Sequence, residues 1–540
     1  MVILLLAACA PPDAPPAPAS AVTLPPRDLL VRASLDARGV RPSIDEYAAV
    51  EADPAALDAL LDTYRADPRF GTRVGDLWSE LYLTRTDTYS VTADSLGLDD
   101  DRAFIEAIGD EPLRVLGYVA DTDLPWTTLV TADWTMANET LATFWPVEYP
   151  EGSVGWVKTR YTDDRPAAGV LAGNALWWRY TSTESNANRK RANIISRLFL
   201  CNDYLTRPLE FDRSVNLLDE AAVADALVTD PGCVNCHKSL DPLASFLFGF
   251  WWLDNNDGWE MAGYHPERER AWADNTGVAP AYYGVPGDSL ADLGRSIAGD
   301  ERFVTCAVEQ AWELLLRRDA TPADTNALVR HRDAFLAGGV TMRALFASIQ
   351  ADPAYRAGDD TGGGVPAKLV TPLVLASQIE DLTGFRWTTA AGYDVFKVDA
   401  AGLDDKGTLL VANAVGFRTL SGAADGYNVT ATAREPNTTL VLVHERLAEA
   451  AAYHVVHADP ARLLPGVTFA ETPATDRAAM AAAIQFLHLR LYGDTVAADS
   501  DEVTAALALW EQLYAVGADA RSAWTGVLSV LLRDPRLLVY

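Results

Sequence analysis

The sequence predicts a mainly α protein of several domains, and three observations lead to this prediction. Apolar residues recur at helical spacing, first at Leu57, Leu60 and Leu61. The chain has 540 residues, 49% of them hydrophobic, so it is globular and too long for one ordinary core. A Gly-rich linker at 357–367 lacks large apolar residues and divides the chain. The helical pattern recurs near 188–202, 300–317, 340–350, 439–456, 476–491 and 503–515.

The N-terminus is typical of an exported protein. An apolar run from Val2 ends in small residues at Ala8, as in a secretory signal. Residues 6–9 resemble a bacterial lipoprotein signal, which implies lipidation of Cys9, a membrane anchor and a place in the cell envelope, on the periplasmic side or in the outer membrane. The Pro/Ala stretch at 10–27 is then a spacer. One feature departs from the signal pattern, because no Lys or Arg precedes the apolar run. The alternative to a lipoprotein signal is a frayed apolar N-terminus with a chance cysteine.

Composition excludes several other classes of protein. The chain has 75 acidic and 44 basic residues, a formal charge of −31, and its field repels phosphate backbones. We therefore expect no nucleic-acid partner. Five cysteines are too few for a disulfide scaffold. No apolar run approaches the roughly 20 residues that span a bilayer. Neither H-E-x-x-H, G-x-S-x-G nor a phosphate loop occurs, so hydrolase chemistry has no motif here.

Three predicted helices close in the same way, on Asp-Pro followed by an aromatic or apolar residue. The dipeptides are Asp67-Pro68, Asp352-Pro353 and Asp534-Pro535. Proline ends a helix sterically, and the next apolar residue can dock back onto the bundle. We interpret the repetition as related helical modules; a common helix stop is the alternative. Trp/Tyr-rich ranges at 145–183 and 247–286 are predicted to be loops with little strand.

Residues 233–237, Cys-Val-Asn-Cys-His, carry the most specific chemistry. The C-x-x-C-H pattern is that of c-type haem attachment. Thiols of Cys233 and Cys236 on one turn can both reach porphyrin vinyl groups as thioethers, and His237 then faces the iron as proximal ligand. Three other interpretations compete. A zinc site needs two further Cys or His nearby, a thioredoxin-like dithiol needs an αβ context, and a chance disulfide leaves His237 unexplained.

The residues around this motif extend the haem hypothesis. We expect the chain to turn away after the motif and a backbone carbonyl near Pro242 to accept the free N–H of His237. The apolar residues of 246–252 offer a wall for the macrocycle, although core packing explains them equally. Arg189, Lys190 and Arg191 are expected near a helix start, where they pair with haem propionates or with an ordinary acidic neighbour.

The sixth iron ligand is left open by the sequence. Met261 is one candidate, and a methionine ligand suits electron transfer. His265 is another, and a second histidine typically lowers the reduction potential. An open position and a ligand from elsewhere in the chain are the remaining alternatives. Met261 and His265 are both tentative, because such residues usually pack or face solvent. His444, His454 and His457 are expected to be ordinary helix histidines.

Residues 110–356 resemble the multi-module cytochrome c family of domains of unknown function that is abundant in planctomycetes. The resemblance is carried by stretches at 111–113, 129–142, 165–171, 189–201, 233–243 and 300–310. It implies a haem module and a disulfide between Cys201 and Cys306, the two cysteines that lipid and haem leave over. Free buried thiols are the alternative to that pairing. The order of the helical modules differs from the family's, since much helical material follows the haem segment.

These interpretations give a domain order and a function to test. We expect one covalent haem c in an exported monohaem cytochrome-like lipoprotein that transfers electrons to a redox partner protein. A haem-dependent, peroxidase-like oxidoreductase and a polysaccharide-binding surface lipoprotein are the alternatives. The expected segments are the signal at 1–9, the spacer at 10–27, helical N-terminal modules at 28–215, the haem module at 216–356, the linker at 357–367 and a C-terminal helical domain at 368–540.

Overall fold

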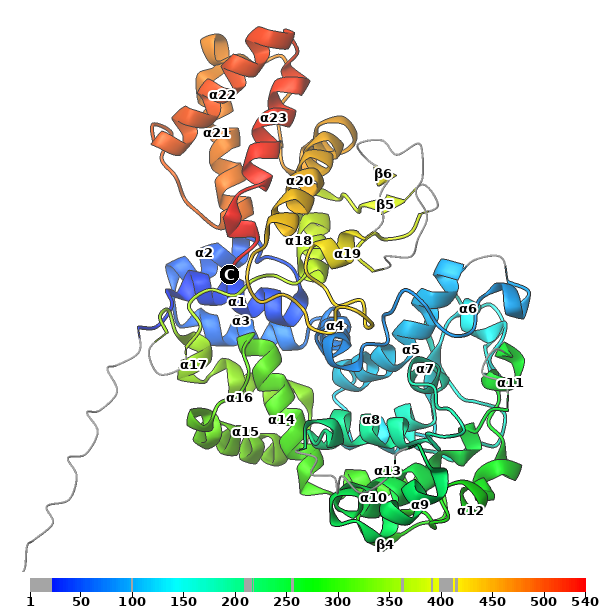
Figure 1. The fold of residues 1–540 in the computed structure, drawn as a ribbon. Helices are drawn as coiled ribbons and strands as arrows, with labels where there is room; N and C mark the ends of the chain where they lie inside the picture. Colours follow the sequence, from blue (N-terminus) through cyan, green and yellow to red (C-terminus); the bar gives the residue numbers. More distant parts are fainter. Residues whose placement is uncertain are drawn as a thin grey trace, which may run out of the picture.

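The computed structural model describes residues 22–98, 101–207, 216, 218–253, 257–360, 364–389, 392–397, 411–412 and 416–540. Helices dominate these residues, and the strands are short, so the predicted mainly α fold is confirmed (Figure 1). Cys9, the signal and most of the spacer lie outside the described residues. Within the described part of the chain, no helix has the length and apolarity needed to cross a membrane.

The helices follow one another along the chain with short connections. The N-terminal ones are α1 (Pro26–Arg38), α2 (Ile44–Ala52), α3 (Ala56–Arg65), α4 (Phe70–Tyr82), α5 (Asp101–Asp121), α6 (Glu139–Ala142), α7 (Asn174–Arg179) and α8 (Arg189–Leu200). The middle ones are α9 (Glu220–Thr229), α10 (Pro231–Ala244), α11 (Gly258–Ala262), α12 (Trp272–Asn275), α13 (Leu290–Ala298), α14 (Glu301–Leu316), α15 (Thr325–Ala337), α16 (Met342–Gln350) and α17 (Pro353–Arg356). The C-terminal ones are α18 (Pro372–Thr383), α19 (Phe417–Leu420), α20 (Thr438–Ala458), α21 (Pro473–Tyr492), α22 (Asp501–Gly517) and α23 (Ala520–Leu532).

Three two-stranded pairings interrupt the helices. Strands β1 (Thr135–Ala137) and β2 (Val157–Thr159) are antiparallel, as are β3 (Ala281–Tyr282) and β4 (Val285–Pro286), while β5 (Thr388–Thr389) and β6 (Val411–Ala412) are parallel. The aromatic-rich ranges contain three of these strands, β2, β3 and β4, together with short helices, including the 3₁₀ turns η5 (Ser245–Phe250) and η6 (Pro266–Ala271). They are therefore irregular segments with little strand, as predicted.

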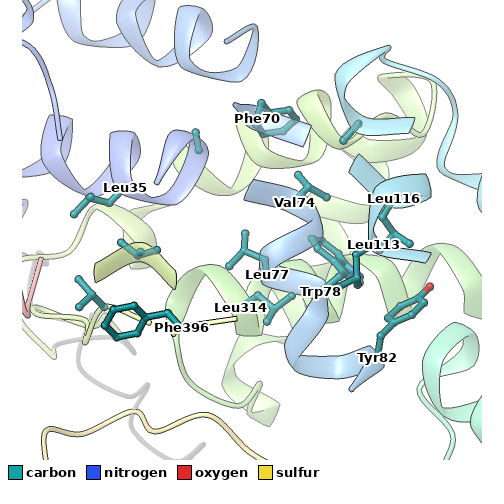
Figure 2. Close-up of a cluster of buried hydrophobic side chains, with 14 of the residues drawn as sticks. Leu35, Phe70, Val74, Leu77, Trp78, Tyr82, Leu113, Leu116, Leu314 and Phe396 are labelled. Atoms are coloured by element: carbon teal, nitrogen blue, oxygen red, sulfur yellow. The ribbon is translucent and has the colours of Figure 1, made fainter. Parts of the chain in front are cut away.

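The largest helix contact joins α4 and α5 at the centre of the core (Figure 2). Phe70, Val74 and Trp78 of α4 are buried there. The two backbones approach so closely that a Cβ on Gly71 would lie 2.3 Å from the carbonyl oxygen of Gly117. Only glycine permits this approach, so the spacing of the two helices is set by residues without side chains.

The three Asp-Pro units form three matching turns. The carboxylates of Asp67, Asp352 and Asp534 each accept a hydrogen bond from the backbone N–H two residues ahead. The apolar residue that follows is buried in every case, as Phe70, Tyr355 and Leu537. The first unit lies between the other two, with α1–α3 placed between α14–α17 and α18–α23 (Figure 1).

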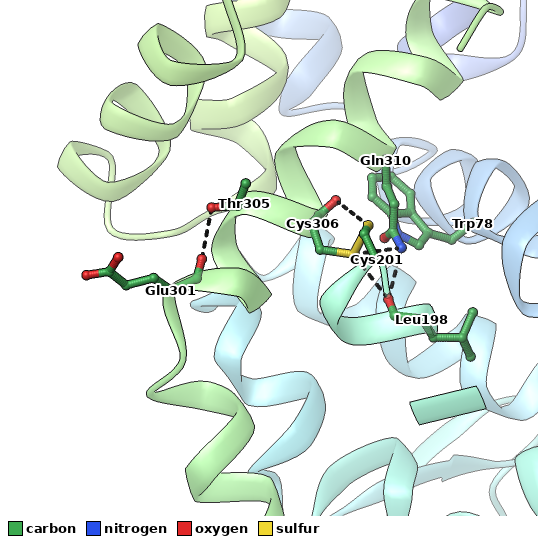
Figure 3. The surroundings of a disulfide bond; sticks show 7 residues. All are labelled: Trp78, Leu198, Cys201, Glu301, Thr305, Cys306 and Gln310. Atoms are coloured by element: carbon green, nitrogen blue, oxygen red, sulfur yellow. Dashed lines mark hydrogen bonds between the residues drawn. A yellow bond between two sulfur atoms is a disulfide. The ribbon is translucent and has the colours of Figure 1, made fainter. Parts of the chain in front are cut away.

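The described parts of 28–215 and 216–356 share one hydrophobic core. Helix α8 packs against both α10 and α14, and α16 packs against α3. A disulfide joins Cys201 at the end of α8 to Cys306 in α14, which is the pairing that the family resemblance implies (Figure 3). Gln310 reinforces it, because its amide accepts from Trp78 of α4 and donates to the Leu198 carbonyl of α8. The packing of the described residues therefore continues from one expected segment into the other, and the boundary at 215/216 stays a prediction.

The described ends of the 357–367 segment form hydrogen bonds with α1 and with the residues just before it. Gly358 donates to the carbonyl of Val22, and the Arg32 guanidinium donates to the carbonyls of Val365 and Pro366. Lys368, directly after the segment, is 2% exposed and forms an ion pair with Asp36 of α1 at 2.5 Å. The C-terminal helices are thus held against the N-terminal ones through buried polar contacts.

Candidate haem site

Helix α10 carries the C-x-x-C-H motif in its first two turns. Asp230 precedes it as cap, and its carboxylate accepts hydrogen bonds from the backbone N–H groups of Gly232 (2.9 Å) and Cys233 (3.1 Å). Pro231 opens the helix at a position where no backbone donor is needed. Because Cys233, Cys236 and His237 are spaced i, i+3 and i+4, one face of α10 carries all three side chains.

Both cysteines of the motif are free thiols. Cys236 is 8% exposed, and Cys233 is partly exposed. Burial raises the pKa of the Cys233 thiol, and the Asp230 carboxylate raises it further. A dithiol oxidoreductase depends on a thiol whose pKa is lowered, so this environment is wrong for that chemistry. Two free thiols on one helix face do fit thioether attachment to a porphyrin.

The ring of His237 is held by a carboxylate. Its Nδ1 lies 2.9 Å from Oδ1 of Asp241, one helical turn further along α10. Arg189 of α8 holds the same carboxylate through Nε at 2.7 Å and Nη2 at 3.1 Å. Burial alone would raise the pKa of Asp241, but the hydrogen bonds from His237 and Arg189 outweigh it and hold that pKa below its ordinary value.

This arrangement selects the histidine nitrogen that faces a ligand. An ionised Asp241 accepts, so Nδ1 of His237 carries the proton and donates it. Nε2 is then the nitrogen with a free lone pair, and among the described residues it makes no hydrogen bond. The side chain of His237 is 22% exposed, which leaves the ring accessible. A histidine nitrogen with a free lone pair is one of the axial ligands that haem iron accepts.

The sequence prediction was wrong about the acceptor. A backbone carbonyl near Pro242 was expected after a turn, but α10 continues through Pro242 to Ala244. Backbone carbonyls of a continuing helix point along its axis, whereas a carboxylate at i+4 lies beside the ring. Of the basic cluster, Arg189 pairs with an acidic neighbour, one of the two expected alternatives.

A second contact braces α10 against α8. The hydroxyls of Tyr204 and Ser239 lie 2.8 Å apart, within hydrogen-bond distance. The Tyr204 hydroxyl donates in turn to that of Tyr283, which lies 3.2 Å from Ser196 of α8. Since α8 is joined to α14 by the disulfide, the motif helix is held on a cross-linked scaffold.

The structure does not bring Met261 or His265 to His237. Met261 is fully buried in α11, which packs against α7 and the 3₁₀ turn η1 (Asp94–Leu96), whereas α10 packs against α8, α9, β3 and η5 (Figure 1). The ring nitrogens of His265 are already engaged, Nε2 by the Glu260 carbonyl and Nδ1 by the Glu267 carboxylate. Neither tentative sixth ligand faces the motif in this conformation.

The aromatic residues after the motif belong to the core. Phe246, Phe248 and Phe250 of η5 are buried, and Phe250 packs edge-on against Tyr264. Core packing, the second of the two interpretations, therefore describes them. In the described part of the chain, no three His, Cys, Asp or Glu side chains are grouped closely enough to hold a metal ion.

No protein-family model, curated protein or solved structure matches the chain. The cytochrome c family thus stays a resemblance carried by sequence motifs. The role of Asp241 was missed by sequence reasoning, although its i+4 spacing from His237 is the signal that would have indicated it. The contact with Arg189, which lies 52 positions away, has no such signal.

Proposed function

We propose that this chain binds one haem c through Cys233 and Cys236, with His237 as proximal iron ligand, and transfers electrons to a redox partner protein in a bacterial envelope. The observation that carries the proposal is a pair of free thiols beside a histidine whose Nδ1 is fixed by Asp241. Export and a lipid anchor at Cys9 belong to the same proposal and rest on sequence alone.

Each residue of the site has a separate task. Haem supplies one-electron redox chemistry when it is bound. Cys233 and Cys236 fix its position relative to α10, and His237 presents Nε2. Asp241 keeps the proton on Nδ1 and raises the basicity of the ring. Arg189 prevents the buried carboxylate from being an unpaired charge.

Haem attachment is tested by co-expression with a cytochrome c maturation system. We expect a coloured product whose mass exceeds that of the polypeptide by one haem and which gives a c-type pyridine haemochrome spectrum. The Cys233→Ser/Cys236→Ser variant should be colourless. Cys201→Ser/Cys306→Ser is the matched control: it also replaces two cysteines and should keep the haem. A colourless wild-type protein with a folded far-UV spectrum would refute the proposal.

Asp241→Asn should raise the reduction potential by about 60 mV. A neutral amide accepts more weakly than a carboxylate by about 1.4 kcal/mol, which is tenfold in a one-electron equilibrium. The less basic His237 then stabilises ferric iron less. Arg189→Gln is the control expected to shift the potential in the opposite direction. It removes the cation that binds the Asp241 carboxylate, so that this carboxylate accepts more strongly from His237 and the reduction potential falls. Spectroelectrochemical titration measures both, and equal shifts of the same sign would contradict a role for Asp241.

A haem centre with an open sixth position is the second candidate function. It is favoured by the positions of Met261 and His265, which lie away from His237, and by the carboxylate on the proximal ring. The spectrum of the holoprotein decides between the two. Low-spin bands with a sulfur–iron signature favour electron transfer, whereas a high-spin centre that reacts with peroxide favours catalysis. Polysaccharide binding gains no support from Trp145, Trp177 and Trp178, which are buried.

A further inference from the structure

A cavity of about 340 Å³ lies beside the start of α8 and is distinct from the thiol face of α10. Its walls include Phe250, Trp251 and Trp252, and the guanidinium of Arg191 lines it. Glu184 is the acidic residue of the lining, and it is exposed at the rim. Polar side chains of Ser182, Thr183 and Asn275 complete the lining, and a volume of this size is typical of a site for a small ligand.

The Arg191 cation is buried without a counterion. The residue is 1% exposed, and its guanidinium donates to the carbonyls of Tyr180 (3.0 Å) and Phe250 (2.8 Å) and to Oδ1 of Asn188 (2.9 Å). All of these acceptors are neutral. Among the described residues Arg191 forms no ion pair, and burial lowers its pKa to about 9, so it stays charged at neutral pH. Burying an unpaired charge is unfavourable unless an anion joins it.

Two further donors near Arg191 lack partners, and one of them, in Trp252, belongs to a residue that lines the cavity. Nε1 of Trp252 and Nδ2 of Asn188 are buried and make no hydrogen bond, and these residues are 6% and 0% exposed. The amide of Asn188 is oriented by Arg191, which requires its oxygen and leaves its NH₂ group free. The guanidinium lies 4.5 Å from the ring of Trp252. A cation and an unused N–H donor on the lining of one cavity are the complement of a carboxylate.

We propose that this cavity binds a carboxylate group that pairs with Arg191 and accepts from Trp252. Two sources carry that chemistry: a propionate of the bound haem or a free organic acid. The propionate source rests on the proposed haem function. It is suggested by the neighbouring Arg189, because Arg189 binds Asp241 and Asp241 in turn contacts His237, the proposed iron ligand. The free-acid source stands without haem.

Calorimetric titration with benzoate tests the proposal, with benzamide as the neutral ligand of the same shape. The colourless Cys233→Ser/Cys236→Ser protein should bind benzoate at least about tenfold more tightly than benzamide, because only the anion pairs with Arg191. If the matured holoprotein then fails to bind benzoate, a propionate occupies the cavity. If it binds equally well, the ligand is a free organic acid.

Trp252→Phe is the informative variant, since replacing Arg191 removes several hydrogen bonds within the core. It keeps the aromatic wall, removes the Nε1 donor and should weaken benzoate binding about tenfold and benzamide binding less, because a neutral amide oxygen is the weaker acceptor. The matched control Leu253→Ala, at an exposed lining position, should change neither. The absence of any preference for benzoate in the colourless protein would overturn the proposal. A failure of haem attachment would leave this arm of the experiment intact, so the two proposals fail separately.

Discussion

Removing the disulfide, in the variant Cys201→Ser/Cys306→Ser, is expected to lower the free energy of unfolding by about 4.7 kcal/mol. The bond closes a loop with a sequence separation of 105, and a cross-link across a loop of that length restricts the unfolded chain most strongly. It also holds α8, on which α10 is braced, to α14. Urea unfolding followed by tryptophan fluorescence measures the loss as a lower midpoint.

The matched comparison is Cys233→Ser/Cys236→Ser, which makes the same two substitutions in thiols that are not cross-linked. Its loss should stay near 1 kcal/mol, because only Cys236 is buried. Adding a reductant should lower the midpoint of the wild-type protein and leave that of the Cys201→Ser/Cys306→Ser variant unchanged. Equal midpoints for the two double variants would mean that the disulfide does not stabilise the scaffold.

Asp36→Asn is expected to destabilise the protein by about 3–5 kcal/mol at pH 6. Asp36 is 1% exposed, and its carboxylate pairs with Lys368 and accepts hydrogen bonds from Tyr355 (2.7 Å) and Tyr540 (2.8 Å). These partners come from the middle and the end of the chain, so the cluster joins all three groups of helices. Removing one member of a buried pair leaves the other charge uncompensated.

The loss should depend on pH in a predictable direction. Burial lowers the pKa of Lys368 from 10.5 to about 7, although Asp36 opposes this shift. Between about pH 7 and pH 10.5 Lys368 is protonated in the unfolded chain and neutral in the folded chain. Because the unfolded chain binds more protons, the free energy of unfolding rises with pH in this range. Without Asp36 the folded pKa falls further, and Asp36→Asn therefore costs most below pH 7. At pH 9 Lys368 is neutral in both folded proteins, and the loss should be much smaller.

Urea midpoints at pH 6 and pH 9 check this prediction. The double variant Asp36→Asn/Lys368→Met is the control, since it buries no charge. It should lose less stability at pH 6 than Asp36→Asn alone and should show no difference in loss between the two pH values. An equal loss for Asp36→Asn at both pH values would rule out the unpaired lysine as the cause.

Local pattern was sufficient to predict several of the helices, among them α3, α8, α14 and α20. The spacing of Leu57 and Leu61 placed α3, and the three Asp-Pro units each ended a helix with its apolar residue buried. These features depend on contacts within a few residues, so sequence alone reveals them. The expected turn after the motif was wrong, because α10 continues through Pro242 to Ala244.

Long-range contacts were not readable in this way. Arg189, Asp241 and His237 meet because α8 packs against α10, and Arg191 lines a cavity because η5 closes over it. The Cys201–Cys306 pair came from a family resemblance and not from spacing.

The sequence by itself determined the helical class and predicted the chemistry of the C-x-x-C-H motif, because both depend on residues that are neighbours along the chain. Only the tertiary structure decided which nitrogen of His237 is free, what its partner is, and where Met261 and His265 lie. Those outcomes depend on the packing of helices distant in the chain, and packing is fixed by the summed contacts of the whole core.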